Sequence, residues 1–334
     1  MLRKERVKKA LQHKQTDVVP YNISFTIPAY QKLVKYYSDE KISDKIGNHL
    51  VRISAVSSDA WQEISPDIWQ DEFKVVWNRT VDKDIGTVEG YVFPEPELYG
   101  YKFPEPNLKT RYAKFEEIAN SKPDGFIIGG IGFSLFERAW TLRGMENILI
   151  DMKLNPNFVE ELLDRILEYN LAVIEGMSKY KIDACHFGDD WGSQHGLIMG
   201  PSMWRKFIKP RIAKMYRKVH EKGLAVSIHS CGDIKEVIPD LIDIGLNIMN
   251  PFQPEVMDVY EMKQKYGKNL CFWGGVSTQS TLPYKTPDDV KKEVKQLLSE
   301  IGKDGGYILA PAHDIPSDVP TENMLALIEV VQNQ

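Results

Sequence analysis

Regular alternation of strand-like and helix-like segments after residue 124 is the feature that most limits how this chain can fold. Short apolar runs typical of buried strands occur at 126–130, 182–187, 224–230, 246–249, 270–275 and 305–310. Helical patterns lie between them, and the clearest begins at Asn155-Pro156 and continues to Met177. Strands that alternate with helices at this spacing form a parallel sheet. With a further strand at 18–24, the pattern predicts about eight units and favours a closed barrel.

The fold class that we predict is therefore α/β, as a single (β/α)8 TIM barrel that occupies residues 1–334. A length of 334 residues fits one barrel of roughly 250 residues with insertions. Residues 2–13 predict an N-terminal helix. Residues 62–115 differ in character, with three nearby tryptophans and two Phe-Pro-Glu-Pro copies, and they predict an inserted, hairpin-rich lid segment over the barrel mouth. Glycine patterns such as Gly129-Gly130-x-Gly132 lack the spacing of a dinucleotide-binding loop.

The charge and composition of the chain exclude some classes of binding partner. The formal net charge is −5 and the lysines are scattered, so we expect no nucleic-acid binding. No 18-residue apolar run occurs, and the charged first residues do not lead into a signal peptide, so we expect a soluble, cytoplasmic protein with no membrane partner. Three cysteines form no disulfide framework. The expected partners are small molecules or other proteins, and a homodimer is one of the assemblies that the sequence allows.

The segment 224–233 is the expected centre of the chemistry. Successive side chains of a strand point to opposite faces, so Leu224, Val226 and Ile228 share one face, while His229 and Cys231 share the other. In a parallel barrel these two residues would point inward at the carboxyl end of the strand, where barrel enzymes hold their active sites. A His-x-Cys pair in that position can bind zinc. The alternative is a buried thiol beside a hydrogen-bonded core histidine.

His313 follows the last predicted strand and would reach the same end of the barrel. Together, His229, Cys231 and His313 offer three zinc ligands and leave a fourth position open, which is typical of catalytic zinc. The alternative for His313 is a hydrogen bond within a loop.

Polar residues after the other strands are candidates for the rest of the site. Asp189 and Asp190 can orient a substrate or act as general acid or base, and only one of them can face inward if the backbone there is extended. The alternative is a solvated or capping role. Residues expected to bind substrate around the mouth are Trp191, Gln194, Asn250, Gln253 and Gln279. Core packing is the alternative for the tryptophan, and simple solvation for the glutamines.

Several of these segments together resemble the uroporphyrinogen decarboxylase superfamily. The resemblance is carried by the segment from Gly188 to Gln194, by His229-Ser230-Cys231-Gly232, by Asn250-Pro251, by Gly274-Gly275 and by the segment from Gly306 to Pro311. It implies a single (β/α)8 barrel with one of two activities. One is cofactor-free decarboxylation of a porphyrinogen. The other is methyl transfer to or from the cobalamin of a corrinoid protein, with zinc held by His-x-Cys and a later cysteine.

The methyltransferase branch is the closer match. The decarboxylase is expected to carry an arginine-rich segment after its first strand, whereas residues 21–51 contain no arginine. The zinc motif matches at His229 and Cys231, with His313 where the resemblance places the second cysteine. One thiolate and two imidazoles leave zinc more positive than two thiolates would, which favours polarising an oxygen. We therefore expect a zinc-dependent enzyme that transfers a methyl group from a small O-methyl compound, such as a methoxylated aromatic, to the cobalamin of a partner corrinoid protein. His313 as a proton donor, an acceptor-side methyltransferase, a decarboxylase and a non-catalytic binding protein are the alternatives.

Overall fold

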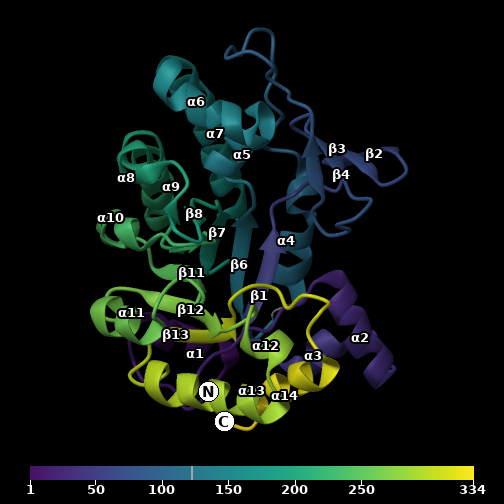
Figure 1. Cartoon of the computed structure of the whole chain (residues 1–334), viewed down its shortest axis with the longest axis vertical. Helices are drawn as coiled ribbons and strands as arrows, with labels where there is room; N and C mark the ends of the chain where they lie inside the picture. The colour runs from purple at the N-terminus through teal and green to yellow at the C-terminus, as the bar shows by residue number, and fades with distance from the viewer. Residues whose placement is uncertain (122) are drawn as a thin grey trace.

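Seven parallel strands form the curled sheet at the centre of the computed structural model, which describes residues 1–121 and 123–334 (Figure 1). Their order in the sheet is β1-β6-β7-β10-β11-β12-β13, which is also their order along the chain. The strands are β1 (Leu50–Ser54), β6 (Phe126–Ile131), β7 (Ala184–Gly188), β10 (Ala225–His229), β11 (Ile248–Phe252), β12 (Cys271–Val276) and β13 (Tyr307–Pro311). This arrangement confirms the predicted parallel α/β sheet of TIM-barrel type.

Residues 20–23 connect the two edges of this sheet. The backbone N–H of Asn22 donates to the carbonyl of Leu309 in β13, and the N–H of His49, just before β1, donates to the carbonyl of Tyr21. Tyr21 and Leu309 form an isolated parallel bridge rather than part of a continuous ladder. The predicted strand at 18–24 is thus an extended segment with few ladder bonds, and Pro20 has no N–H to donate.

Helices follow most of the strands and cover the outside of the sheet (Figure 1). The longest, α7 (Pro156–Met177), has Asn155 at its N-cap, as the sequence predicts. The other helices are α1 (Arg3–Leu11), α2 (Ile27–Tyr37), α3 (Ile42–Ile46), α4 (Lys109–Ser121), α5 (Phe136–Arg143), α6 (Met145–Leu154), α8 (Gly200–Met203), α9 (Lys209–Glu221), α10 (Ile238–Asp243), α11 (Val259–Tyr266), α12 (Thr281–Tyr284), α13 (Pro287–Gln296) and α14 (Thr321–Gln332).

Three local features were not predicted from the sequence. A π-helical turn, η1 (Trp204–Ile208), separates α8 from α9 and ends two residues before Pro210. The side chain of Asp233 accepts the N–H of Lys235 next to a short 3₁₀ turn, η2 (Lys235–Val237), ahead of α10. Strand β1 and helices α2 and α3 lie in a region for which no element was predicted.

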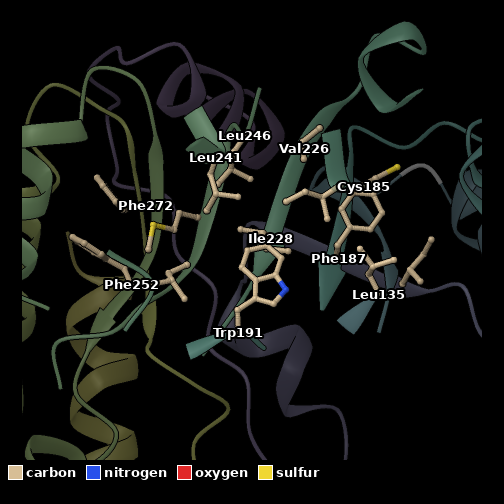
Figure 2. Close-up of a cluster of buried hydrophobic side chains, with 14 of the residues drawn as sticks. Leu135, Cys185, Phe187, Trp191, Val226, Ile228, Leu241, Leu246, Phe252 and Phe272 are labelled. Carbon is tan, nitrogen blue, oxygen red and sulfur yellow. The ribbon is translucent and has the colours of Figure 1, made fainter. Parts of the chain in front are cut away.

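Two layers of apolar side chains flank the sheet. Inside the barrel, Trp273 and Ile308 pack with Val7 and Ala10 of α1, so this helix contributes to the core on the inner face of the strands. Outside the barrel, Val226 and Ile228 of β10 pack among residues such as Phe187 and Trp191 (Figure 2). The two faces of β10 therefore alternate as the sequence predicts.

The hairpin-rich segment forms a separate antiparallel sheet, at the right of Figure 1. Its strands are β2 (Trp61–Ser65), β3 (Ile68–Asp71), β4 (Val76–Asn78) and β5 (Thr87–Glu89). Asp71 joins this sheet to α5 through a buried ion pair with Arg138 at 2.6 Å. The predicted range of 62–115 is too long, because residues from Lys109 onward belong to α4, which precedes β6. Whether the sheet acts as a lid stays a prediction.

Candidate metal centre

His229, Cys231 and His313 come together at the carboxyl end of the barrel. His229 is the last residue of β10, Cys231 follows it after one residue, and His313 lies two residues beyond β13. The Nε2 atom of His229 is 3.3 Å from the Sγ atom of Cys231. One ligand atom from each of the three residues lies within 4.8 Å of the other two. The structure therefore places the three predicted zinc ligands in one cluster, which we call the His-Cys-His triad.

Asn250 fixes the orientation of the His229 ring. Its Oδ1 atom is 2.6 Å from Nδ1 of His229, and its Nδ2 atom donates to the carbonyl of Trp273 at 2.9 Å. Since the amide nitrogen is committed to that carbonyl, the amide oxygen is the group that faces His229, and it accepts the Nδ1–H. The Nε2 lone pair is then directed towards Cys231. A metal-binding histidine usually donates its other ring N–H to an acceptor in this way, and the bond fixes the tautomer and the orientation of the ring.

The two adjacent aspartates have different surroundings. Asp189 is fully buried, and its carboxylate accepts N–H groups from Leu135 and Glu137 at the start of α5 and the Nε1–H of Trp191. Burial raises the pKa of Asp189 to about 6, against the effect of these donors. Asp189 is therefore a buried capping group, contrary to its predicted catalytic role. This outcome agrees with the expectation that only one of the pair faces inward.

Asp190 is the member of the pair that lies at the triad. Its Oδ1 atom accepts the backbone N–H of Cys231 at 2.8 Å and is 3.9 Å from Nε2 of His229. It also lines the cavity next to the triad. This carboxylate can therefore both hold the Cys231 loop and exchange a proton with a group in the cavity.

Electrostatics around the triad are dominated by burial and by two carboxyl groups. Burial lowers the pKa of His229, so this ring is neutral at pH 7. Burial, and then the charges of Asp190 and Glu137, raise the pKa of the Cys231 thiol. Burial and the neighbouring Asp190 and Asp189 also raise the pKa of Glu137 well above its usual range. The site thus combines a neutral imidazole and a thiol with nearby acidic groups that make the electrostatic potential negative. This combination favours the binding of a cation.

A cavity of about 480 Å³ opens beside the triad inside the barrel mouth. Its polar lining includes Asp190, Glu137, His186, His229 and His313. The apolar lining consists of Ile53, Ile85, Ile128, Ile131, Phe133, Trp273, Ala310, Pro311 and Ala312. Ile85 comes from the loop between β4 and β5, so the antiparallel sheet contributes directly to the cavity wall.

The predicted substrate-binding residues do not all reach this cavity. Asn250 lines it, whereas Gln194, Gln253 and Gln279 line a second depression of about 320 Å³ that also touches Cys231 and His313. The side chain of Gln253 is engaged with the backbone N–H of Gly232 at 3.1 Å.

Trp191 was predicted to bind substrate, and this prediction is wrong. Its side chain is fully buried in the outer core (Figure 2). The ring packs against that of Trp204 at 5.3 Å between centroids. Its Nε1–H is bound to Asp189. Trp191 therefore supports the Asp189 loop from behind and does not contact the cavity.

The sequence analysis did not assign Arg52, Trp273 or Glu137 to the site, although all three line the cavity. Arg52 lies in β1, where no strand was predicted and one residue beyond the arginine-free range 21–51. Trp273 lies on the predicted strand at 270–275, and alternation from Cys271 could have placed it on the inward face. Glu137 lies on α5 and carries no sequence signal that identifies it.

Zinc fits the geometry of the triad. Tetrahedral zinc with nitrogen and sulfur ligands at about 2.0 to 2.3 Å separates its ligand atoms by roughly 3.3 to 3.6 Å. The 3.3 Å distance between His229 Nε2 and Cys231 Sγ lies in that range. His313 is exposed and follows the end of its strand, so its ring has room to approach. Three ligands of this kind would leave a fourth position on the metal open.

The fold and the cavity define a class: parallel barrels with a polar site at the carboxyl end of their strands. Within that class, residues 83–334 match the model of the uroporphyrinogen decarboxylase family, and the chain belongs to this family. The resemblance inferred from the sequence is thereby confirmed.

Relatives with an assigned name are distant. The chain is 22% identical over 182 residues to uroporphyrinogen decarboxylase of Ruthia magnifica, and the match covers 53% of this chain and 50% of that protein. It is 22% identical over 264 residues to the enzyme of the same name from Chlorobaculum tepidum, with 77% and 68% covered. The chain thus spans about half to two-thirds of the length of these relatives.

Among solved structures, a methyltransferase from Methanosarcina mazei matches along its whole length. Its TM-score is 0.77 at 22% sequence identity, and the match covers 100% of this chain and 99% of that chain. At this identity, the likeness establishes the shared fold. Within the described residues, no helix combines the length and the apolar character needed to cross a bilayer.

Proposed function

We propose that this protein is a zinc-dependent methyltransferase that moves a methyl group between a small O-methyl compound and the cobalamin of a corrinoid protein. The observation that carries the proposal is the His-Cys-His triad, of which His229 and His313 line the barrel-mouth cavity. The full-length fold match to a protein named methyltransferase is consistent with it.

Bound zinc would act as a Lewis acid that polarises the ether oxygen of the substrate. Methyl transfer from such a substrate would break the methyl–oxygen bond and leave both bonding electrons on the oxygen, and the reduced corrinoid would supply the electron pair that accepts the methyl group. The oxygen then takes up one proton to leave as an alcohol or phenol. Atoms and electrons therefore balance without a further oxidant or reductant.

The residues of this chain have separate roles in that reaction. His229, Cys231 and His313 would hold the metal, and Asn250 keeps Nε2 of His229 available for it. Asp190 lies close enough to the triad to hold or deliver the proton that the departing oxygen needs. The apolar cavity wall excludes water from the transfer.

Zinc content is the direct test. We expect about one zinc per chain in protein purified with zinc present, and loss of this zinc in Cys231→Ala. Cys185→Ala is the matched control, since Cys185 is a fully buried core thiol on β7 and should keep its metal. Wild-type protein without zinc, or equal zinc in Cys231→Ala and wild type, would contradict the proposal.

Methyl transfer itself is tested with the zinc-loaded protein and a reduced corrinoid protein. Methoxylated aromatics should methylate the cobalt, whereas free thiols should not remove a methyl group from it. The opposite pattern would identify an acceptor-side enzyme.

Decarboxylation is the second candidate, because the named relatives are uroporphyrinogen decarboxylases and the cavity contains Arg52. The charge of the cavity argues against it. Arg52 is the one arginine or lysine among the described residues that line the cavity, and the acidic residues Asp190 and Asp314 line it too. A polycarboxylate substrate would meet more negative than positive groups. We therefore expect no conversion of uroporphyrinogen to coproporphyrinogen, and enzymatic formation of that product would establish the decarboxylase.

A further inference from the structure

Arg52 differs from the arginines that stabilise this fold. Arg111, Arg138 and Arg143 each pair with a carboxylate at 2.6 or 2.7 Å and lie almost fully buried. The guanidinium of Arg52, in contrast, makes no hydrogen bond with any of the residues that the structure describes. Its nearest carboxylate atom is Oδ1 of Asp314 at 3.8 Å, beyond hydrogen-bonding distance, and that atom already accepts the hydroxyl of Ser24.

The position of Arg52 in the barrel indicates where a partner for its guanidinium N–H groups would bind. Arg52 is in the middle of β1 and lines the same cavity as His229 and His313. Its guanidinium carbon lies 5.7 Å from the centre of the Trp273 ring, which holds the planar group against the inner wall. The side chain is 48% exposed and is one of the residues that line the cavity. Five N–H donors are thus available to a molecule bound in the cavity.

We propose that Arg52 forms an anion subsite that selects a methyl donor or acceptor carrying one carboxylate. This inference builds on the proposed function, because it assigns the part of the substrate that does not react. A carboxylate matches the fork of a guanidinium through two parallel hydrogen bonds, and such charge-assisted pairs are stronger than neutral ones. The reacting heteroatom would then lie at the triad, on another part of the same cavity wall.

The other residues of the cavity wall indicate which chemical group would connect the carboxylate of the substrate to its reacting heteroatom. Apolar side chains such as Ile53, Ile131 and Phe133 form the wall, and they favour a compact hydrocarbon or aromatic body. Asp314 and Asp190 also line the cavity and would repel further carboxylates. The substrate class that fits is a methoxylated aromatic monocarboxylate rather than a polyanion.

Two nearly isosteric probes test the subsite: 4-methoxybenzoate and 4-methoxybenzamide, measured by titration calorimetry. We expect wild-type protein to bind the acid more tightly than the amide. Arg52→Gln should weaken binding of the acid about tenfold to a hundredfold, as the loss of a charge-assisted pair does, and leave the amide unchanged. Arg52→Lys should retain part of the preference. Arg217→Gln, at an exposed position on α9, makes the same change of charge outside the cavity and should bind like wild type.

The titration is performed on zinc-loaded protein and again after removal of metal with a chelator, because a carboxylate can also bind zinc directly. An effect of Arg52→Gln that persists without metal supports the subsite even if the zinc proposal fails. Equal affinity of Arg52→Gln and wild type for the acid, in protein that binds zinc, overturns the subsite and leaves the proposed function standing. Absence of any preference for acid over amide in wild type also overturns it.

Discussion

Replacing Asn250 by alanine should weaken zinc binding without removing any ligand of the metal. The variant loses the bond of 2.6 Å that keeps the proton on Nδ1 of His229 and leaves Nε2 free. The ring can then rotate and change tautomer. Loss of such a supporting bond costs tenfold to a hundredfold in metal affinity, which corresponds to about 1.4 to 2.7 kcal/mol.

The same substitution also leaves two polar groups without partners, Nδ1–H of His229 and the carbonyl of Trp273. Each costs about 1 to 3 kcal/mol of stability if water does not replace the lost bond. The effect on zinc must therefore be separated from general destabilisation. Asn323→Ala provides the control, because this buried amide donates to the carbonyls of Leu282 and Lys285 and does not contact the triad.

Zinc dissociation constants are measured by competition with a chromophoric chelator at constant pH, and unfolding free energies by urea titration. We expect both alanine variants to lose stability and only Asn250→Ala to lose zinc affinity. Asn250→Asp should keep the affinity, since a carboxylate still accepts the Nδ1–H, but should lose stability because it faces the carbonyl of Trp273. Zinc binding by Asn250→Ala as tight as that of wild type would refute the supporting role of Asn250.

Three further predictions concern the third ligand and two buried carboxylates. If His313 is a ligand, His313→Ala should lose zinc affinity, and His313→Cys should keep zinc but demethylate an oxygen donor more slowly, because a second thiolate lowers the charge of the site. Full zinc occupancy in His313→Ala, together with a rate about 10² to 10⁴ times lower, would instead identify a proton donor. Asp189 has a pKa of about 6 in the folded protein and its ordinary pKa of about 3.8 in the unfolded chain, so stability should fall by about 3 kcal/mol as pH rises through this window. Asp189→Asn should lack that fall in urea titrations at pH 4.5 and 7, and an identical pH profile would refute the assignment. Asp71→Ala should lower the free energy of unfolding by about 3 to 5 kcal/mol, because it leaves Arg138 buried without its partner. A loss below about 1 kcal/mol would show that the pair does not anchor the antiparallel sheet.

Strand periodicity was sufficient to predict the centre of the candidate site. Alternation along 224–231 places His229 and Cys231 on the same face and the apolar residues on the other, and both faces are found as expected. The position of His313 followed from the rule that the carboxyl ends of parallel strands share one end of a barrel. These inferences use short-range geometry that a single sequence contains.

Contacts between distant elements could not be predicted in the same way. Which of Asp189 and Asp190 faces the cavity is decided by the start of α5, whose free N–H groups bind Asp189. Trp191 is held in the core by the same carboxylate. Arg52 was missed because β1 is a short strand with no regular helix pattern before it, so nothing in the sequence assigned an inward direction to its side chain.

Closure of the barrel has a consequence for synthesis on the ribosome. Residues 20–23 complete the ring only by bonding to Leu309 and to the chain before β1, and His313 follows in the same C-terminal segment. At about 5 to 20 residues per second, the ribosome needs roughly 15 to 60 seconds to make the 290 or so residues between these partners. During this interval the growing sheet has an open edge and an incomplete triad. The nascent chain therefore acquires its closed barrel and the complete His-Cys-His triad together, once residues 309–313 have been made.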